Sequence, residues 1–504
     1  MNSQKSICAK TILPLTVLAL LSGCQKQEQK PAAPAAAVPK AAIVSAEKTS
    51  FDEVTARLDK GGNFYLYLST EQALSGLSGK MAGISNFIGS LPGVPGEQSQ
   101  TISKVFDFAT TCLKDSGIEQ ISGVGMSSIA REPGFYYGKL IVHHYPGQNA
   151  GAIWSMFGKA PHPLQELDLL PETTVFATFS DLDVPLAWNN IQKHLELLDI
   201  PAVTDSMQQW PAQFRKMTGL DFDKVLASLG GNYGIIFTLD EQKKFSLPLP
   251  GGAVEIPSPG LVIVAKVNSD VIFNRVDELC KSNPLVVRVD NPDLKMRTMT
   301  IPLPLPLDLR PSIARSGDYL FLASSDTLVQ NILAVKAGKQ KGFKSTAEFA
   351  KLSQGIPEEG NNFSLVADQL AKSLMQFQQQ TLTNKGTMTS AQVEALQHTF
   401  HSGTNYGSYS VGVNGPEGWE GCANGSQSMQ SVIVGTAVGV GVAAAIVVPT
   451  LIKAHQAAQH SKSALYIPQP AGTPPAAPLA RDLHGHATGS EISAPAAEKK
   501  PSAS

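Results

Sequence analysis

Between residues 51 and 425, short segments of alternating apolar and polar residues are interrupted by longer helical patterns. The first such unit contains the strand-like run 63–68, helical patterns near 71–91 and 99–115, and a turn at Glu132-Pro133-Gly134. Alternation with a period of two indicates strands, and proline with glycine between two such runs indicates a hairpin. The pattern predicts an α+β fold in which repeated strand–helix–helix–strand–strand units form mixed sheets flanked by helices.

The same order of elements recurs later in the chain, which suggests an internal duplication. The runs Gly230–Gly234 and Gly403–Gly407 share the pattern Gly-x-Asn-Tyr-Gly, and each precedes a predicted strand. Glycine and asparagine are common before strands, so chance recurrence is the alternative. A stretch rich in proline and glycine at 241–260 separates the two predicted halves of the body, 51–240 and 258–425.

The N-terminus has the pattern of an export signal. Two lysines precede Thr11–Leu21, an apolar run of 11 residues that is too short to span a bilayer. Leu21-Ser22-Gly23-Cys24 follows, and it resembles the lipobox of bacterial lipoproteins, whose cysteine is acylated and becomes the first residue. The resemblance implies a signal peptide over 1–23 and lipid attachment, as palmitate, at Cys24. An ordinary secretory signal followed by a cysteine is the alternative.

Residues 24–50 predict a disordered tether that begins at the lipidated cysteine. The stretch is rich in Gln, Lys, Ala and Pro and lacks apolar periodicity. Such a composition cannot bury enough apolar surface to offset the entropy that folding would cost. The tether is therefore expected to hold the folded body away from a membrane surface.

Val432–Ile452 contains 21 residues without a charge, which is enough to cross a bilayer as a helix. We therefore expect a transmembrane helix at 431–453, with a buried soluble helix as the alternative. Acidic residues precede this segment and lysines follow it. The bias of positive charge toward the cytoplasm then predicts a body in the periplasm and a disordered cytoplasmic tail at 454–504.

The expected location is the inner membrane, because a spanning helix resists transfer to an outer membrane. Gln25, in place of Asp after the cysteine, resembles the sorting pattern that permits export, so the outer membrane is the alternative. Residues 444–454 also resemble the distal half of the membrane helix of type IV pilins. Val432 stands where those pilins have an essential Glu. We therefore expect an anchor helix here and not a pilin-like assembly segment.

Part of the body resembles a family of uncharacterised bacterial envelope proteins. The resemblance rests on Ala314–Leu374, where a strand hairpin leads through Gly317–Ser325 into a helix. The run Ser345–Phe349 and a strand before Val366–Leu370 complete the pattern. It is carried by apolar spacing more than by polar signatures, and it implies an α+β fold with no known activity.

The balance of charge gives no sign of a nucleic-acid partner, because 40 basic and 42 acidic residues leave a net charge of −2. Of the five cysteines, Cys112, Cys280 and Cys422 lie in the body, which can therefore hold at most one internal disulfide. The chain contains no Cys-x-x-Cys pair. We expect no cofactor and no metal.

Familiar catalytic motifs are absent from the sequence, including Gly-x-Ser-x-Gly, the P-loop and His-Glu-x-x-His. His143 and His144 are adjacent in a predicted strand, so their rings point to opposite faces and cannot share one metal ion. His398 and His401 are three residues apart on a predicted helix, where we interpret them as surface histidines. His484-Gly485-His486 lies in the predicted tail.

Asp181 and Asp183 follow a predicted strand and begin a predicted helix, where carboxylates are favoured by the helix dipole. We prefer this interpretation to a pair of catalytic carboxylates. The aromatic run Phe135–Tyr137 suits packing in the core or across strands, with glycan or peptide binding as the alternative.

Together these features predict a non-enzymatic lipoprotein of the cell envelope whose periplasmic body binds or scaffolds other envelope proteins. Cys24 is its one predicted site residue, and no catalytic residue is identified. The alternatives are a periplasmic hydrolase with an active site assembled from distant residues, and an accessory protein of secretion or pili. A polar cleft with converging His, Asp or Ser favours the hydrolase, and a broad apolar surface favours the binding protein.

Overall fold

A computed structural model of the chain describes residues 49–89, 96–198, 201–249, 252–300, 309–384 and 407–428. The strands are β1 Phe64–Ser69, β2 Ile121–Glu132, β3 Phe135–His144, β4 His162–Pro163, β5 Thr174–Asp181, β6 Leu229–Leu249, β7 Gly252–Val267, β8 Val286–Asn291, β9 Leu294–Met299, β10 Ser312–Ser316, β11 Tyr319–Ala323, β12 Glu359–Gly360, β13 Asn362–Val366, β14 Ser408–Gly415 and β15 Gly418–Gly425.

The α-helices are α1 Phe51–Thr55, α2 Glu71–Leu74, α3 Leu77–Gly89, α4 Gly96–Ser116, α5 Ala152–Ser155, α6 Val184–Leu198, α7 Pro201–Thr218, α8 Phe222–Ser228, α9 Val271–Leu279, α10 Asp326–Lys336, α11 Ala347–Leu352 and α12 Asp368–Asn384. Short 3-10 helices are η1 Ile118–Gln120, η2 Gln165–Leu169 and η3 Phe343–Ser345.

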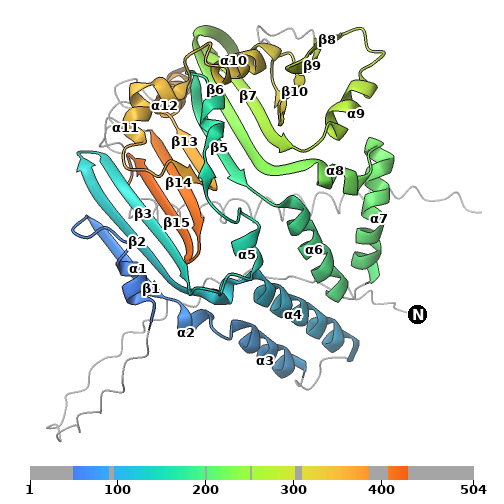
Figure 1. Ribbon diagram of the computed structural model, residues 1–504, viewed down its shortest axis with the longest axis vertical. Helices are drawn as coiled ribbons and strands as arrows, with labels where there is room; N and C mark the ends of the chain where they lie inside the picture. The colour runs from blue at the N-terminus through green and yellow to red at the C-terminus, as the bar shows by residue number, and fades with distance from the viewer. Residues whose placement is uncertain are drawn as a thin grey trace, which may run out of the picture.

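One 13-stranded sheet runs through the whole described body (Figure 1). Its strand order is β1-β2-β3-β15-β14-β13-β5-β6-β7-β11-β10-β9-β8, and every pairing in the described part of the chain is antiparallel. The two short strands β4 and β12 form a separate ladder. The C-terminal strands β13–β15 are inserted between β3 and β5, so residues from both ends of the body lie side by side.

The prediction of mixed sheets was therefore wrong, and the helical connections explain why. Helices α3 and α4 contact each other as a pair between β1 and β2. The first helix of such a pair carries the chain away from the sheet, and the second carries it back to the same end of the sheet. The next strand then runs antiparallel to the previous one, as β1 and β2 do. Only a connection that returns to the opposite end of the sheet produces a parallel neighbour.

The proline-rich stretch at 241–260, which was predicted to separate two halves, belongs to a long hairpin. β6 and β7 pair from Leu229↔Val267 to Leu249↔Gly252, with two register shifts along the ladder. β5 and β13 are also directly paired, so strands from both predicted halves are neighbours in the sheet centre. The sheet is continuous across the predicted boundary.

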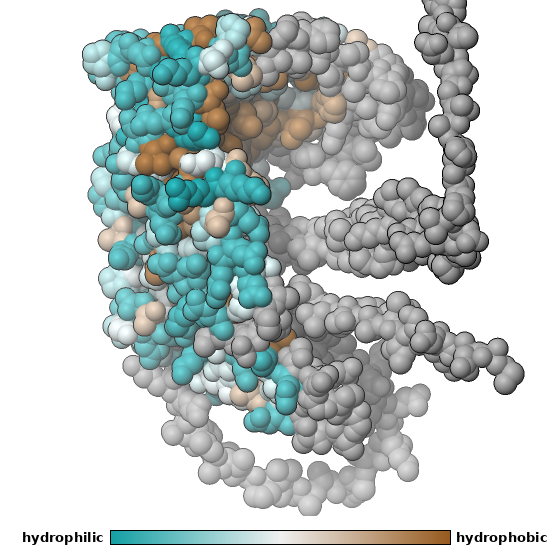
Figure 2. All heavy atoms as spheres, turned by 90° about the vertical axis from the view of Figure 1, so that its right-hand side faces the viewer, coloured by the Kyte–Doolittle hydropathy of each residue, from teal (hydrophilic) through white to brown (hydrophobic). Residues whose placement is uncertain are grey.

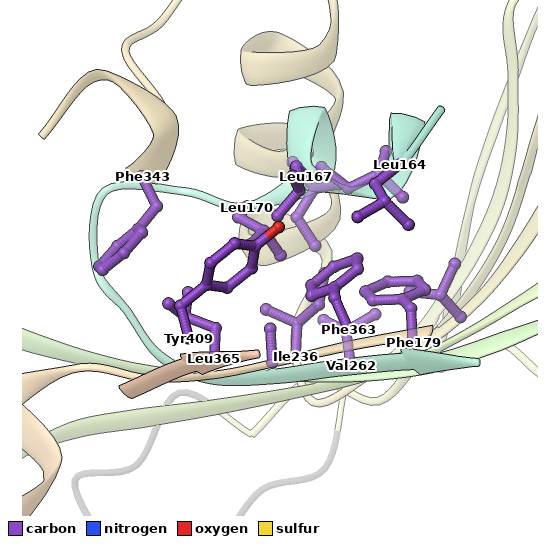
Figure 3. Packing of buried hydrophobic residues seen from close by; sticks show 14 of the residues in the cluster. Leu164, Leu167, Leu170, Phe179, Ile236, Val262, Phe343, Phe363, Leu365 and Tyr409 are labelled. Atoms are coloured by element: carbon purple, nitrogen blue, oxygen red, sulfur yellow. The ribbon is translucent and has the colours of Figure 1, made fainter. Parts of the chain in front are cut away.

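The main hydrophobic core covers one face of this sheet (Figure 3). Phe179, Phe363 and Tyr409 rise from the neighbouring strands β5, β13 and β14, and each is at most 2% exposed. Leu167 and Leu170, from η2 and the residue that follows it, pack on the same cluster from above. Burial of these side chains supplies the main stabilisation of the fold.

Several predicted features lie outside the described residues. They are the signal peptide 1–23, the tether from Cys24 up to residue 48, the transmembrane helix at 431–453, the tail 454–504, and the histidines His398, His401, His484 and His486. Within the described ranges, no helix is both long and apolar enough to cross a membrane.

The antiparallel strand pairings correct the predicted fold class to one large antiparallel sheet with accompanying helices.

Candidate functional site

A polar cavity of about 600 Å³ opens where β5 ends and β6 begins. We name it the Asp181 pocket. Its wall includes His162, Asp181 and Asn232, with Lys266 from the end of β7 and Lys159 from the loop before β4. The volume lies within the range of small-molecule sites, and the polar groups converge from segments that are distant in sequence.

Asp181 is the centre of the hydrogen-bond network that shapes this pocket. Asn232 Nδ2 donates to its Oδ1 at 3.0 Å, and Asn361 Nδ2 donates to its Oδ2 at 3.1 Å. His162 Nε2 lies 3.0 Å from Oδ2. The Asp181 side chain is only 14% exposed, so these donors replace most of the water that the carboxylate would otherwise bind.

A glycine allows this network to close. Gly158 has φ +92°, and a Cβ at this position would lie 2.3 Å from Asn361 Nδ2 and 2.6 Å from Asp181 Oδ2. Any other residue would therefore be strained in its backbone and would displace the bond between Asn361 and Asp181. Asn414 Nδ2 adds a second link by donating to the carbonyl groups of Trp154 and Gly158.

Both ring nitrogens of His162 lie within hydrogen-bond distance of oxygen acceptors. Nδ1 faces the carbonyl oxygen of Pro163 at 3.1 Å, and Nε2 faces the Asp181 carboxylate. Burial by itself lowers the pKa of His162, but the bonds to Pro163 and Asp181 outweigh it and raise the pKa above its ordinary value. When the ring is protonated it donates from both nitrogens, and it then has no lone pair with which to act as a general base.

The raised pKa of His162 makes part of the protein's stability pH-dependent. A group whose pKa is higher in the folded state contributes its full stabilisation of the fold below its unfolded pKa, which is about 6.5 for histidine. That contribution is lost as pH rises through the folded-state pKa. We expect His162→Gln to cost about 1 kcal/mol at about pH 5.5 and less at about pH 8.5, since the half-exposed ring is screened by solvent. Urea unfolding of both proteins at the two pH values measures this, and an equal loss at both would contradict it.

A buried ion pair lies beside the pocket wall. Lys266 Nζ is 2.8 Å from Glu166 Oε1, and Glu166 is only 1% exposed. Tyr319 donates its hydroxyl to the same oxygen at 3.2 Å. Burial, followed by the charge of Glu166, raises the pKa of Tyr319, so the hydroxyl keeps its proton and remains a donor. Glu166 and the largely covered Asp181 are thus each in contact with a basic side chain.

The structure corrects the interpretation of Asp181 and separates the two aspartates. Asp183 Oδ1 accepts from Leu186 N at 2.9 Å and so caps the start of α6, as predicted. Asp181 is the last residue of β5, and its carboxylate turns into the network of His162 and the two asparagines instead of a helix start. The two carboxylates do not act as a pair.

The remaining predicted candidates lie in the core. His143 Nδ1 is 2.6 Å from Ser122 Oγ, and His144 Nδ1 is 2.8 Å from the Tyr145 carbonyl oxygen. Both histidines are fully buried, and burial lowers the pKa of His143. Phe135 and Tyr137 are buried as well, which confirms the packing interpretation for these two rings.

The described cysteines form neither a disulfide nor a cluster of metal ligands with other side chains that the structure describes. Cys112, Cys280 and Cys422 are all free thiols. In the ranges that the structure describes, no group of three or more His, Cys, Asp or Glu side chains is arranged to hold a metal ion. Sequence reasoning missed His162, Asn361, Glu166 and Lys266; Asn232 alone lay in a noted pattern, Gly-x-Asn-Tyr-Gly.

Comparison of the chain with known protein families, with curated proteins and with solved structures finds no match.

Proposed function

We propose that this protein is a lipid-anchored protein of the bacterial cell envelope whose periplasmic body binds a small zwitterionic ligand in the Asp181 pocket. The ligand class is a free amino acid or a short peptide, which carries an ammonium and a carboxylate group. The observation that carries the proposal is that Lys159 and Asp183, of opposite charge, both lie on the wall of one polar cavity and neither has an ion-pair partner among the described residues.

The other charges of the pocket are already matched, so they do not need a ligand. Asp181 is bound by His162, and Lys266 is bound by Glu166. Lys159 and Asp183 make no ion pair with any residue that the structure describes. Burial of a zwitterion against one lysine and one carboxylate would satisfy both groups of the ligand and fix its orientation.

Lipid anchoring is supported by the sequence Leu21-Ser22-Gly23-Cys24 after the apolar run. We expect Cys24→Ala to leave the precursor uncleaved at this site and without acyl chains, because the thiol that receives the lipid is gone. Mass spectrometry of the purified N-terminus measures both effects. A wild-type chain with an unmodified Cys24, or with cleavage elsewhere, would refute the anchor.

The membrane that carries the anchor is tested separately. Density separation of inner and outer membranes, followed by immunoblotting, distinguishes the inner-membrane location that a spanning helix at 431–453 would impose from the outer-membrane alternative. Protease treatment of spheroplasts should digest the body, since the proposal places it in the periplasm. Protection of the body in intact spheroplasts would contradict that placement.

Ligand binding is tested by calorimetric titration of the full chain with L-alanyl-L-alanine as the probe. We expect binding that weakens by about fivefold to tenfold in Lys159→Met and in Asp183→Asn, because each substitution removes one charge contact. Asparagine is as good a helix cap as aspartate, so Asp183→Asn preserves the start of α6.

Lys341→Met, at an exposed lysine that does not line the pocket, is the matched control and should bind the dipeptide as the wild type does. Absence of binding to the wild type, or equal binding by all three variants, would overturn the proposed ligand class. It would leave the lipid anchor untouched, since Cys24 is tested by a different measurement.

A further inference from the structure

The face of the sheet opposite the main core exposes a contiguous apolar surface. Ile235, Leu261, Ile263 and Leu322 come from the neighbouring strands β6, β7 and β11, and their exposed fractions are 39%, 45%, 47% and 46%. Ile263 is paired directly with Ile235 on one side and with Leu322 on the other. We name these four residues the apolar sheet face.

A groove beside this surface adds to its apolar area. It has a volume of about 380 Å³ and is lined by Leu261, Ile263 and Leu322 together with Val276 and Cys280 at α9. Figure 2 shows hydrophobic residues gathered in a hollow on one side of the molecule. Contiguous apolar surface of this kind marks a contact site, because single exposed apolar residues are normal but a packed row of them is not.

We infer that residues 432–452 of this same chain dock on the apolar sheet face. The segment carries no charge and contains seven Val, three Ile and one Leu among its 21 residues. Its apolar side chains can therefore cover those of the apolar sheet face. Docking would not have to desolvate a charge on the segment.

The position at which the chain leaves the sheet supports this occupant. A single row of paired residues crosses the sheet from Gly425 at the end of β15 to Leu261 in β7, and its members are Gly425, Ser408, Val366, Phe176, Phe237 and Leu261. The chain thus leaves β15 on the row of the sheet that contains Leu261 of the apolar sheet face.

The length of the connection also suffices. Five strand spacings separate β15 from β7, which is about 24 Å. Residues 426–431 reach about 20 Å when extended, and the apolar segment itself continues beyond them. A partner joined through so short a connection is present at a millimolar effective concentration, so it outcompetes a free partner of equal affinity.

The test uses Cys280, a native free thiol on the rim of the groove. A second cysteine is introduced in the full chain at Ala443, Ala444 or Ala445, in separate variants, and the protein is oxidised at several dilutions. We expect an intramolecular disulfide between Cys280 and at least one of these positions, identified as a linked peptide pair. Its yield should not change with dilution, and Cys280→Ser should abolish it.

Two control variants separate docking from chance collision and from misfolding. Ala494→Cys, in the tail, should give no more than about a tenth of the linked product, because that residue is not part of the docked segment. Ile263→Lys places a charge on the docking surface at an exposed position and should raise the rate of protease cleavage within 432–452 about tenfold. Leu66→Lys, at an exposed site on β1, should leave that rate unchanged.

The other occupants of the apolar sheet face give different results. A disulfide between copies whose yield rises with protein concentration would show that a second copy docks there, and it would overturn the inference. Labelling of 432–452 by a photoreactive lipid, without any disulfide to Cys280, would assign the segment to the bilayer and would also overturn it. Absence of both signals would do the same.

Discussion

Replacing Phe363 with alanine should lower the free energy of unfolding by about 3–5 kcal/mol. The ring is 1% exposed and stacks on Phe179 with their centroids 5.3 Å apart. Its strand β13 lies in the middle of the sheet, where Phe363 is paired with Phe179 on one side and Val411 on the other. Backbone bonds to both neighbours hold the strands apart, so the cavity left by the ring cannot collapse.

Denaturant unfolding of the wild type and the variant, followed by circular dichroism, measures this loss. Met217→Ala is the control, because Met217 is 68% exposed, and it should change stability by less than about 0.5 kcal/mol. A loss below about 1 kcal/mol for Phe363→Ala would mean that the sheet centre repacks freely. The position assigned to β13, in the middle of one sheet, would then be wrong.

Local elements of this fold were predictable because their signals lie within a few residues. The turn Glu132-Pro133-Gly134 separates β2 from β3 as expected, since Gly134 has the positive φ that such a turn requires. Ser325 begins α10 by accepting from Leu328 N, which is the bond that a serine before a helix predicts.

The sheet arrangement was not predictable, because nothing in the sequence states which strands become neighbours. The prolines between 241 and 260 were interpreted as a boundary, although Pro257 and Pro259 lie in β7. β7 pairs with β11 only from Val262 onward, so the earlier part of β7 has no strand on that side among the described residues. A proline is tolerated there because its missing N–H faces no partner.

The candidate site could not be predicted from the sequence at all as a cluster of residues. The partners of Asp181 are 19, 51 and 180 residues away along the chain, at His162, Asn232 and Asn361. No local spacing can reveal such a network, and asparagine carries no compositional signal of function. The sequence therefore indicated an acid at a helix start, whereas the pairing of β5 with β6 and β13, and of β4 with β12, brings its donors together.

Lys266→Met should also lower the free energy of unfolding strongly, by about 3–5 kcal/mol, because it leaves Glu166 buried without its cation. Glu166 is 1% exposed, and its Oε2 atom has no hydrogen-bond partner among the described residues. The Tyr319 hydroxyl is the one remaining donor to Oε1 that the structure describes there. A single neutral donor does not replace the water that the carboxylate loses on folding.

The matched control is an exposed ion pair of the same length from the same helical segment. Lys344 Nζ lies 2.8 Å from Asp168 Oδ1, and the two side chains are 45% and 53% exposed. Lys344→Met should therefore cost less than about 1 kcal/mol, because solvent screens the pair and hydrates the remaining carboxylate. Similar losses for Lys266→Met and Lys344→Met would contradict the buried character of the first pair.

The double variant Glu166→Gln with Lys266→Met should be more stable than Lys266→Met alone, since no uncompensated charge remains buried. Urea unfolding of Lys266→Met, of the double variant and of the wild type measures this difference. A double variant no more stable than Lys266→Met would mean that the carboxylate is hydrated in the folded protein, and that the wall of the Asp181 pocket is open at Glu166.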